Sequence, residues 1–277
     1  MADRARFSVT FWGVRGSAPT PGHDTAIYGG NTACIEVDCG DTRLLFDAGT
    51  GIQSFCRSEG ARDGRDLDLF LSHSHLDHIC GLPYLATHRP RGSTCRLWVG
   101  HLETKAHVQH VLEAVMGAPI FPIHLSEMPL AFDVRLFSVG ETLRPHPDIE
   151  IRTAPLNHPD RATGYRVSFD GRSVAYVTDT EHVPGTLDEA ILGLIEGADL
   201  FIYDSTFSDE DFASKAGWGH STWQEGVRLA DAAGVKTYAV FHHDPERNDT
   251  EMDEVARAVA AARIGSIVAR DGMVVTL

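Results

Sequence analysis

The apolar residues of the first 71 positions recur in short runs that end at glycine, aspartate or serine. Residues 7–12 alternate between apolar and polar side chains, as expected for a strand with one buried face. Residues 67–71 form a continuous apolar run that ends at Ser72, which indicates a buried strand. The predicted strands of this region are 7–12, 33–37, 42–46 and 67–71, and a helix through Phe55 is expected after Gly51.

Helical and strand patterns alternate in the rest of the chain. Residues 102–116 have helical spacing, whereas three prolines predict an irregular stretch at 117–129. Asp170-Gly171 between two apolar runs predicts a hairpin. The expected strands are 134–139, 149–154, 165–169, 173–177, 200–203, 237–241 and two within 266–277, and the expected helices are 187–195, 223–233 and 251–263. Strands first and strand–helix alternation later predict one layered α/β domain over residues 1–277, with sheets inside and helices outside.

Composition narrows the range of partners. The formal net charge of −15 repels a nucleic-acid backbone, although bound cations would still admit a small anion. The N-terminus runs directly into a strand pattern without the apolar core of a signal peptide, and no apolar run is long enough to span a membrane. Five cysteines without Cys-x-x-Cys spacing favour reduced thiols. These features predict a cytoplasmic protein without a membrane partner.

The chemistry of the chain is concentrated in the segment Ser72-His73-Ser74-His75-Leu76-Asp77-His78, which follows a predicted buried strand. Three imidazoles and a carboxylate this close together cannot all be buried without partners. Imidazole and carboxylate together suit zinc, and also iron or manganese. The alternative is a solvated polar loop, but histidine is too scarce for this spacing to arise easily by chance. The segment therefore predicts a metal site.

Three further polar residues follow predicted strands. His158 comes after the strand at 149–154, Asp179 after 173–177, and His242 after 237–241. Each one alone is more typical of a turn or a helix cap. Because all three share their position with the histidine-rich segment, their convergence at one edge of the sheets is favoured.

The motifs resemble those of the metallo-β-lactamase superfamily, in particular its ribonuclease Z and cyclic-phosphodiesterase branch. The matching segments are the histidine cluster, Phe46-Asp47-Ala48-Gly49-Thr50-Gly51-Ile52-Gln53, Gly81-Leu82-Pro83 and Gly219-His220-Ser221-Thr222. The resemblance implies a four-layer αββα sandwich, with two mixed sheets flanked by helices. It also implies two divalent metal ions, with zinc expected and manganese or iron as alternatives, and it leaves a homodimer open.

The resemblance also implies roles for single residues. Asp179 would bridge the two metal ions, and Asp47 would orient ligand histidines through their other ring nitrogen. His243 is a weaker candidate than His242, which comes first after its strand. The first metal ion would be held by His73, His75 and His158, and the second by Asp77, His78 and His242.

The reaction implied is hydrolysis by a metal-activated water, so that Ser74 is not expected to be a nucleophile. The catalytic residues implied are His220, Asp77 and Asp204. His220 would give a proton to the leaving alkoxide or stabilise phosphate charge. Relatives pair this histidine with the glutamate of a His-Glu-Ala-Thr motif, whereas this chain has Tyr203-Asp204-Ser205-Thr206. The shorter Asp204 leaves that pairing in doubt, and His220 could instead be a solvated residue beside a helix cap.

The choice of substrate rests on what the chain lacks. Ribonuclease Z enzymes have a long transfer-RNA-binding arm between the third metal histidine and the bridging aspartate, but only 20 residues separate His158 from Asp179. A small phosphodiester, cyclic nucleotides included, is therefore expected as substrate, and transfer RNA is not. Arg15 and Asn31 lie in glycine-rich loops and are the candidate substrate contacts, although such loops are more often simple turns. Arg15 would contact a phosphate, and the alternative for Asn31 is that it fixes its loop. Residues 117–129, with Phe121, are either a lid or plain packing.

Other functions remain open on the same fold. A β-lactamase or thioesterase would keep the histidine cluster, but it usually lacks a His-Ser-Thr element. A ribonuclease without the arm is a further alternative. A non-enzymatic binding protein would have lost ligands, and a flavodiiron-type enzyme would need acidic replacements and a flavin domain. This sequence retains every expected ligand position and has neither the acidic replacements nor a flavin domain.

Overall fold

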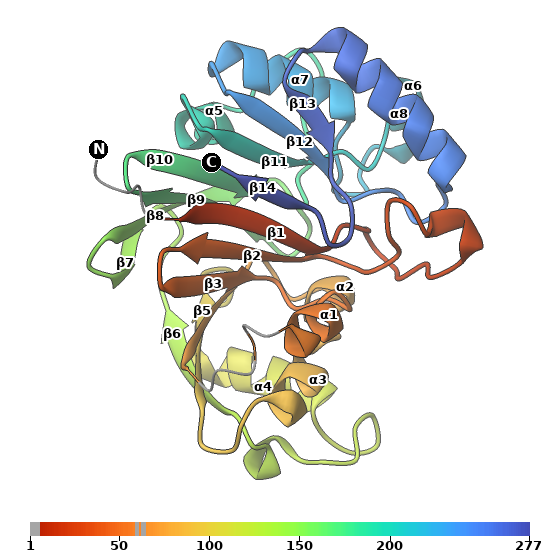
Figure 1. The fold of residues 1–277 in the computed structure, drawn as a ribbon. Helices are drawn as coiled ribbons and strands as arrows, with labels where there is room; N and C mark the ends of the chain where they lie inside the picture. Colours follow the sequence, from red (N-terminus) through yellow and green to blue (C-terminus); the bar gives the residue numbers. More distant parts are fainter. Residues whose placement is uncertain (1–5, 59–60, 62–64) are drawn as a thin grey trace.

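The strands of the computed structural model form two seven-stranded sheets that face each other (Figure 1). The structure describes residues 6–58, 61 and 65–277. In the first sheet the order is β14-β1-β2-β3-β4-β5-β6; pairing is antiparallel from β14 to β3 and parallel from β3 to β6. Its strands are β1 (Phe7–Gly13), β2 (Cys34–Cys39), β3 (Thr42–Phe46), β4 (Leu67–Leu71), β5 (Thr94–Val99), β6 (Ala131–Leu136) and β14 (Val274–Thr276).

The second sheet repeats this plan with the later part of the chain. Its order is β13-β12-β11-β10-β9-β8-β7; pairing is parallel from β13 to β10 and antiparallel from β10 to β7. Its strands are β7 (Thr142–His146), β8 (Ile149–Leu156), β9 (Ala162–Phe169), β10 (Arg172–Val177), β11 (Leu200–Asp204), β12 (Thr237–Phe241) and β13 (Ser266–Val268).

Helices cover the outer face of each sheet (Figure 1). Helices α1, α3 and α4 pack on the first sheet, and α5, α7 and α8 on the second. The helices are α1 (Ile52–Arg57), α2 (Leu76–Ile79), α3 (Leu82–His88), α4 (Lys105–Val115), α5 (Glu189–Ile195), α6 (Asp209–Lys215), α7 (Trp223–Ala232) and α8 (Asp249–Ala262), with short 3₁₀ turns at His23–Thr25 and Leu125–Glu127. The predicted four-layer sandwich of two mixed sheets between helices is confirmed.

The period of two along each strand divides the apolar side chains between the layers. In β3, Leu44 and Phe46 belong to the core between the sheets, whereas Leu45 packs under the helices of the first layer. The inner core also holds Tyr165 and Tyr176 of the second sheet, so the two sheets share one apolar interior. Each fully buried side chain of this size contributes about 1.5–3 kcal/mol. This burial fixes the register of the strands and therefore the positions of the loops that follow them.

Most predicted elements occur where expected. Strands β3, β4 and β12 have the predicted bounds, and β9 and β10 form the hairpin around Asp170-Gly171. The strand predicted at 134–139 is instead β6 (Ala131–Leu136); the apolar pattern continued past its end because Phe137 and Val139 pack against the inner core. Strands β5 and β7 and helices α2, α3 and α6 were not predicted from the sequence.

Two further expectations concern the surroundings of the protein. Residues 1–5, where the sequence shows no signal-peptide pattern, lie outside the described residues. Within the described part of the chain, each helix is too short or too polar to cross a lipid bilayer. All five cysteines are free thiols, as the sequence suggested.

Candidate metal centre

The candidate metal ligands follow the ends of four strands that belong to both sheets. His73 follows β4, His158 follows β8, Asp179 follows β10, and His242 follows β12 directly. These strand ends meet at one edge of the sandwich, where polar side chains can converge above the apolar core. The structure therefore brings together residues that are up to 169 positions apart in the sequence.

The first cluster consists of His73, His75 and His158, whose ligand atoms lie within 4.8 Å of one another. His75 Nδ1 faces His158 Nε2 at 3.0 Å. The His73 side chain is buried, and burial together with the neighbouring His78 lowers the pKa of its imidazole well below the ordinary value. A neutral imidazole is the form that binds a metal ion.

The second cluster consists of Asp77, His78, Asp179 and His242, again within 4.8 Å. The Nε2 atom of His78 lies 3.2 Å from Asp77 Oδ2 and 3.1 Å from Asp179 Oδ2. The Nε2 atom of His242 lies 3.3 Å from Asp179 Oδ1. Asp179 also reaches the first cluster, because its Oδ1 lies 3.8 Å from Nε2 of both His73 and His158. Asp179 thus lies between the two clusters.

Buried imidazole nitrogens without a partner indicate whether the two clusters could hold a cation. The Nε2 atoms of His73, His78 and His242 are buried and have no hydrogen-bond partner. An unsatisfied buried polar atom costs about 1–3 kcal/mol, so three in one place indicate that a ligand is meant to satisfy them. Imidazole and carboxylate groups are the ligand types that zinc, iron and manganese take. The donor set therefore fits divalent cations.

In four of the candidate ligand histidines, the ring nitrogen that faces away from the cluster, Nδ1, has a partner within the protein; we call it the outer nitrogen. Gly219 O accepts from His158 Nδ1, and the carboxylate of Asp47 accepts from His78 Nδ1, both at short distance. Neither acceptor can donate, so each imidazole carries a proton on Nδ1, and in the neutral form of the ring the Nε2 lone pair is available for a ligand. The distances to the outer nitrogens are 2.7 Å for His158, 2.8 Å for His78, 3.0 Å for His73 (to Ser72 Oγ) and 2.9 Å for His242 (to Thr206 Oγ1).

The backbone at the centre is strained. Asp47, Asp179 and His242 have left-handed φ angles of 60°, 53° and 58°, which non-glycine residues adopt rarely. Such conformations cost on the order of 1–3 kcal/mol each and cluster at functional sites. A Cβ atom at Gly219, which has a φ of +83°, would lie 2.5 Å from His158 Nδ1. The glycine is therefore required for the close approach to this ligand.

His220 and Asp204 form a hydrogen-bonded pair beside the second cluster, so the shorter acidic residue does reach the histidine. His220 Nδ1 lies 3.0 Å from Asp204 Oδ2, and Asp204 is in turn held by the backbone N–H of Thr180 and the hydroxyl of Thr206. Burial lowers the pKa of His220, but the nearby carboxylates, Asp204 first, outweigh burial and raise this pKa to about 9. His220 is 8% exposed, which excludes a solvated loop position.

The expectation that Arg15 contacts substrate is wrong. Its side chain is fully buried, and its guanidinium donates to the backbone carbonyls of Gly29, Asp244 and Arg247. These bonds tie two loops together and use the guanidinium within the protein. The loop pattern alone could not reveal this, because a buried arginine and a phosphate-binding arginine look the same in a sequence.

Asn31 likewise fixes a loop. Its Nδ2 donates to Asp271 at 2.8 Å, and its Oδ1 accepts from the Thr50 hydroxyl at 3.2 Å. Both ends of the amide are thus used within the protein, and the proposed substrate contact is replaced by the loop-fixing role. His243 is bound within the protein through one ring nitrogen, because its Nε2 donates to Ala269 O at 2.8 Å, and it belongs to none of the groups with metal-binding geometry among the described residues. This agrees with the choice of His242 over His243 as the ligand.

Sequence reasoning missed His101 and Arg161, which line the cavity over His73 and His75. The cavity measures about 530 Å³. His101 Nε2 lies 3.1 Å from the Ser74 hydroxyl in the lining of this cavity. Phe121 of the 117–129 stretch packs against the core under the first layer of helices and does not line this cavity, which favours packing over a lid.

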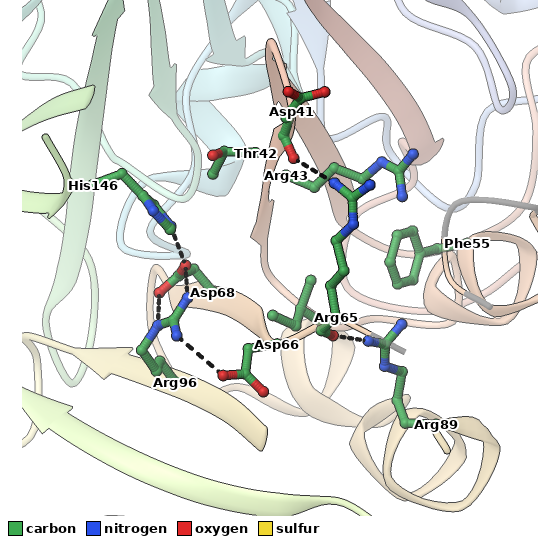
Figure 2. Close-up of a pocket in the computed structure, with 11 residues that line it drawn as sticks. Asp41, Thr42, Arg43, Phe55, Arg65, Asp66, Asp68, Arg89, Arg96 and His146 are labelled. Carbon is green, nitrogen blue, oxygen red and sulfur yellow. Dashed lines mark hydrogen bonds and ion pairs between the residues drawn. The ribbon is translucent and has the colours of Figure 1, made fainter. Parts of the chain in front are cut away.

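A separate pocket lies at the opposite end of β4 (Figure 2). In its lining, Arg96 donates to the carboxylate of Asp68, and Arg89 donates to the backbone carbonyl of Arg65. Within the described residues, the groups with metal-binding geometry all belong to the histidine-rich edge instead.

Known proteins share both the sequence pattern and the fold. A family model described as a beta-lactamase superfamily domain matches residues 42–243. Ribonuclease Z of Bradyrhizobium sp. (strain ORS 278) is 30% identical over 300 aligned positions, which cover 94% of this chain and 97% of that protein. The metallo-beta-lactamase fold protein YhfI from Bacillus subtilis superimposes with a TM-score of 0.73 at 20% identity, covering 99% of this chain and 100% of that one.

A diphosphatase from the PhnP family superimposes with a TM-score of 0.72 at 18% identity, covering 98% of this chain and 97% of that one. At such identities the structural likeness shows the fold alone. The family model, in contrast, covers most of the chain and includes the histidine cluster, His158, Asp179 and His242. The chain therefore belongs to the β-lactamase superfamily and is a hydrolase of the metallo-β-lactamase fold.

Proposed function

We propose that residues 1–277 act as one domain that hydrolyses small phosphodiesters, cyclic nucleotides included, with two divalent metal ions. The observation that carries this proposal is the set of buried imidazole nitrogens without hydrogen-bond partners around Asp179. A protein that kept these atoms unsatisfied without a ligand would lose stability and gain nothing. The His220–Asp204 pair beside them supplies acid–base chemistry.

The two clusters would hold one ion each. His73, His75 and His158 would bind the first, while Asp77, His78 and His242 would bind the second, with Asp179 between them. Zinc suits this ligand set best, and manganese and iron are the alternatives. Two such ions would make water more acidic and stabilise the charge of the reacting phosphate.

The chain's own residues would position and protonate the substrate. Asp204 accepts the Nδ1 proton of His220 and thereby fixes the imidazole next to His158 and His242, whose ring centres lie 5.4 and 4.8 Å away. From this position His220 would give a proton from Nε2 to the leaving oxygen. Asp47 and the carbonyl of Gly219 keep the ligand histidines in the tautomer that leaves Nε2 unprotonated.

A small substrate is supported by the absence of a transfer-RNA arm. The segment between His158 and Asp179 is occupied by the β9–β10 hairpin. The alignment with the Bradyrhizobium ribonuclease Z runs over more positions than the 277 residues of this chain, so that protein contains residues that this chain lacks. Its name nevertheless runs against the expectation that transfer RNA is not a substrate. Cleavage of RNA is therefore the alternative function.

The proposal is tested by metal analysis combined with a substrate panel. We expect about two metal ions per chain, hydrolysis of bis(p-nitrophenyl) phosphate and of cyclic nucleotides, and no turnover of nitrocefin or a thioester. A precursor transfer RNA tests the alternative. Turnover of nitrocefin or the thioester without diester hydrolysis would contradict the proposal, and specific cleavage of the RNA in preference to small diesters would replace it by the alternative.

His220→Ala tests the acid–base assignment within this scheme. We expect kcat on the diester to fall about 10²–10⁴-fold while the metal content stays unchanged. Asp204→Asn should cost about 10–100-fold, because it removes only the group that orients the imidazole. His110→Ala, on the exposed side of α4, is the matched control and should leave kcat unchanged. Unchanged turnover in His220→Ala would contradict the acid–base role.

A further inference from the structure

The cavity over His73 and His75 is lined by one side chain with a permanent positive charge. Besides His73 and His75, it is lined by Ser74, His101, Leu102, Glu103, His107, Asp160 and Arg161. Among these described residues, Arg161 is the one with a guanidinium or ammonium group. In a chain with a formal net charge of −15, an anionic substrate needs such local compensation to enter. Arg15 does not line this cavity, and its guanidinium donates to backbone carbonyls. Arg161 is therefore the arginine at the cavity.

The backbone places Arg161 there under strain. Asp160 and Arg161 are consecutive residues with left-handed φ angles of 60° and 70°. Arginine adopts this conformation rarely, since its Cβ is crowded. The turn is closed by a bond of 3.1 Å from Arg161 N to His158 O, and the carboxylate of Asp160 lies 3.6 Å from His75 Nε2. The turn that carries Arg161 is thus built directly onto two candidate metal ligands.

The side chain of Arg161 is held only weakly. Its Nη1 lies 3.1 Å from Glu103 Oε1, and the two side chains are 73% and 69% exposed. Exposed ion pairs contribute about 0–1 kcal/mol, so Glu103 can be replaced by another anion at little cost. The guanidinium is suited to that exchange, because it binds phosphate through two parallel hydrogen bonds.

Glu103 and Arg161 also line a second cavity of about 570 Å³. Its walls combine apolar side chains, among them Phe137 and Leu156, with polar ones such as Glu141. The ion pair therefore lies where the metal cavity and this second cavity adjoin. A substrate that reaches from the metal centre into the second cavity passes Arg161 on its way.

We propose that Arg161 determines specificity by binding a second phosphate group on the organic part of the diester, in exchange for Glu103. The inference rests on the proposed phosphodiesterase function and adds the class of substrate: a diester with a further phosphate beyond the scissile one. Arg161 is here a binding residue and takes no part in the chemical step.

The test compares two matched esters, thymidine 5′-(p-nitrophenyl phosphate) and the same compound with a 3′-phosphate. We expect the wild-type protein to prefer the 3′-phosphorylated ester about tenfold in kcat/KM, and Arg161→Ala to remove this preference by lowering kcat/KM for that ester more than for the simpler one. Arg161→Lys should keep part of the preference. Arg144→Ala, at an exposed arginine on β7, is the control for loss of one positive charge and should keep all of it.

A binding measurement adds a readout that does not depend on turnover. By titration calorimetry, thymidine 3′,5′-bisphosphate should bind the wild-type protein about tenfold more tightly than thymidine 5′-monophosphate. This difference should vanish in Arg161→Ala and grow in Glu103→Gln, which removes the competing carboxylate. Equal binding of the two nucleotides by the wild-type protein, or an unchanged difference in Arg161→Ala, would overturn the proposal. Failure of the wild-type protein to hydrolyse either ester, with the binding difference intact, would instead count against the phosphodiesterase function.

Discussion

Strand β4 has a buried polar group near each end, and the surroundings of the two groups differ. Near the start of the strand, Asp68 is 1% exposed and accepts hydrogen bonds from Arg96, Trp98 and His146 at 2.6–3.0 Å. Figure 2 shows Asp68 between Arg96 and His146. Just beyond the end, His73 is also 1% exposed, but its Nε2 has no hydrogen-bond partner. Burial is therefore the same at the two ends, and hydrogen bonding is not.

The comparison separates a structural cluster from a functional one. At Asp68 the partners come from β5 and from β7 of the other sheet, so the carboxylate joins the two sheets at the rim of their common core. At the histidine-rich edge the protein satisfies the outer ring nitrogens and leaves the inner ones open toward Asp179. A polar cluster that is complete needs no ligand, whereas one that is open on one side is suited to hold a ligand.

We call the candidate metal ligands around Asp179 the open cluster, and the residues around Asp68 the closed cluster. The largest loss of activity is expected from substitution in the open cluster. Asp179→Ala should lower phosphodiesterase activity at least about 1,000-fold and reduce the metal content, because it removes the carboxylate that lies between the two clusters. Alanine is strained at the left-handed φ of this position, so Asp179→Asn, which tolerates it, should show the same loss in a folded protein. Asp133→Ala on β6 is the surface control. Activity that survived in Asp179→Asn would remove the proposed mechanism.

Substitution in the closed cluster should lower the stability of the protein and leave its activity unchanged. Asp68→Asn should lower the free energy of unfolding by about 3 kcal/mol, because it leaves Arg96 without its buried counter-charge. Urea unfolding measures this loss. The metal content and the kcat of the folded protein should stay the same. Asp66→Asn removes a half-exposed partner of the same arginine and should cost less than about 1 kcal/mol. Loss of metal ions in Asp68→Asn would show that the two ends of β4 are not independent.

The sequence predicted the open cluster far better than the closed one. His73, His75, Asp77 and His78 are close in sequence, and three histidines and an aspartate rarely gather in one short loop unless they bind a metal ion. The positions of His158, Asp179 and His242 after apolar strands follow from the rule that ligands gather at strand ends. The layered fold followed from the same alternation of apolar runs.

The sequence could not predict contacts that depend on the packing of distant segments. Asp68, Arg96 and His146 form one cluster only because β4 pairs with β5 and because the second sheet brings β7 alongside. Strands β5 and β7 were both missed, so their polar residues had no predicted place. The prediction that Arg15 contacts substrate was wrong for the same reason, since the carbonyl groups that it binds include those of residues more than 200 positions away.

Zinc should stabilise the open cluster and leave the closed one unaffected. At a free zinc concentration 100 times the Kd, one site adds about 2.7 kcal/mol to the free energy of unfolding, because only the folded chain presents the ligands together. Asp68→Asn starts from a lower stability and should gain the same increment, whereas Asp179→Asn should gain less. Thermal or urea unfolding of chelated and zinc-loaded protein gives the three values. A full increment in Asp179→Asn would mean that zinc binds elsewhere.

The smallest expected effect is the pH dependence contributed by Asp68. Burial raises the pKa of this carboxyl, but hydrogen bonds from Arg96, Trp98 and His146 outweigh burial and hold its pKa below the ordinary value. The folded state therefore binds the proton less readily than the unfolded chain, so the stabilisation is complete above the unfolded-state pKa and is lost as the pH falls through the folded-state pKa. Urea unfolding at a series of acidic pH values should show wild-type stability converging toward that of Asp68→Asn. The metal ligands titrate in both proteins, so their contribution cancels in the difference between the two. A difference that stayed constant as the solution became acidic would show that Asp68 stabilises the rim through packing and not through its charge.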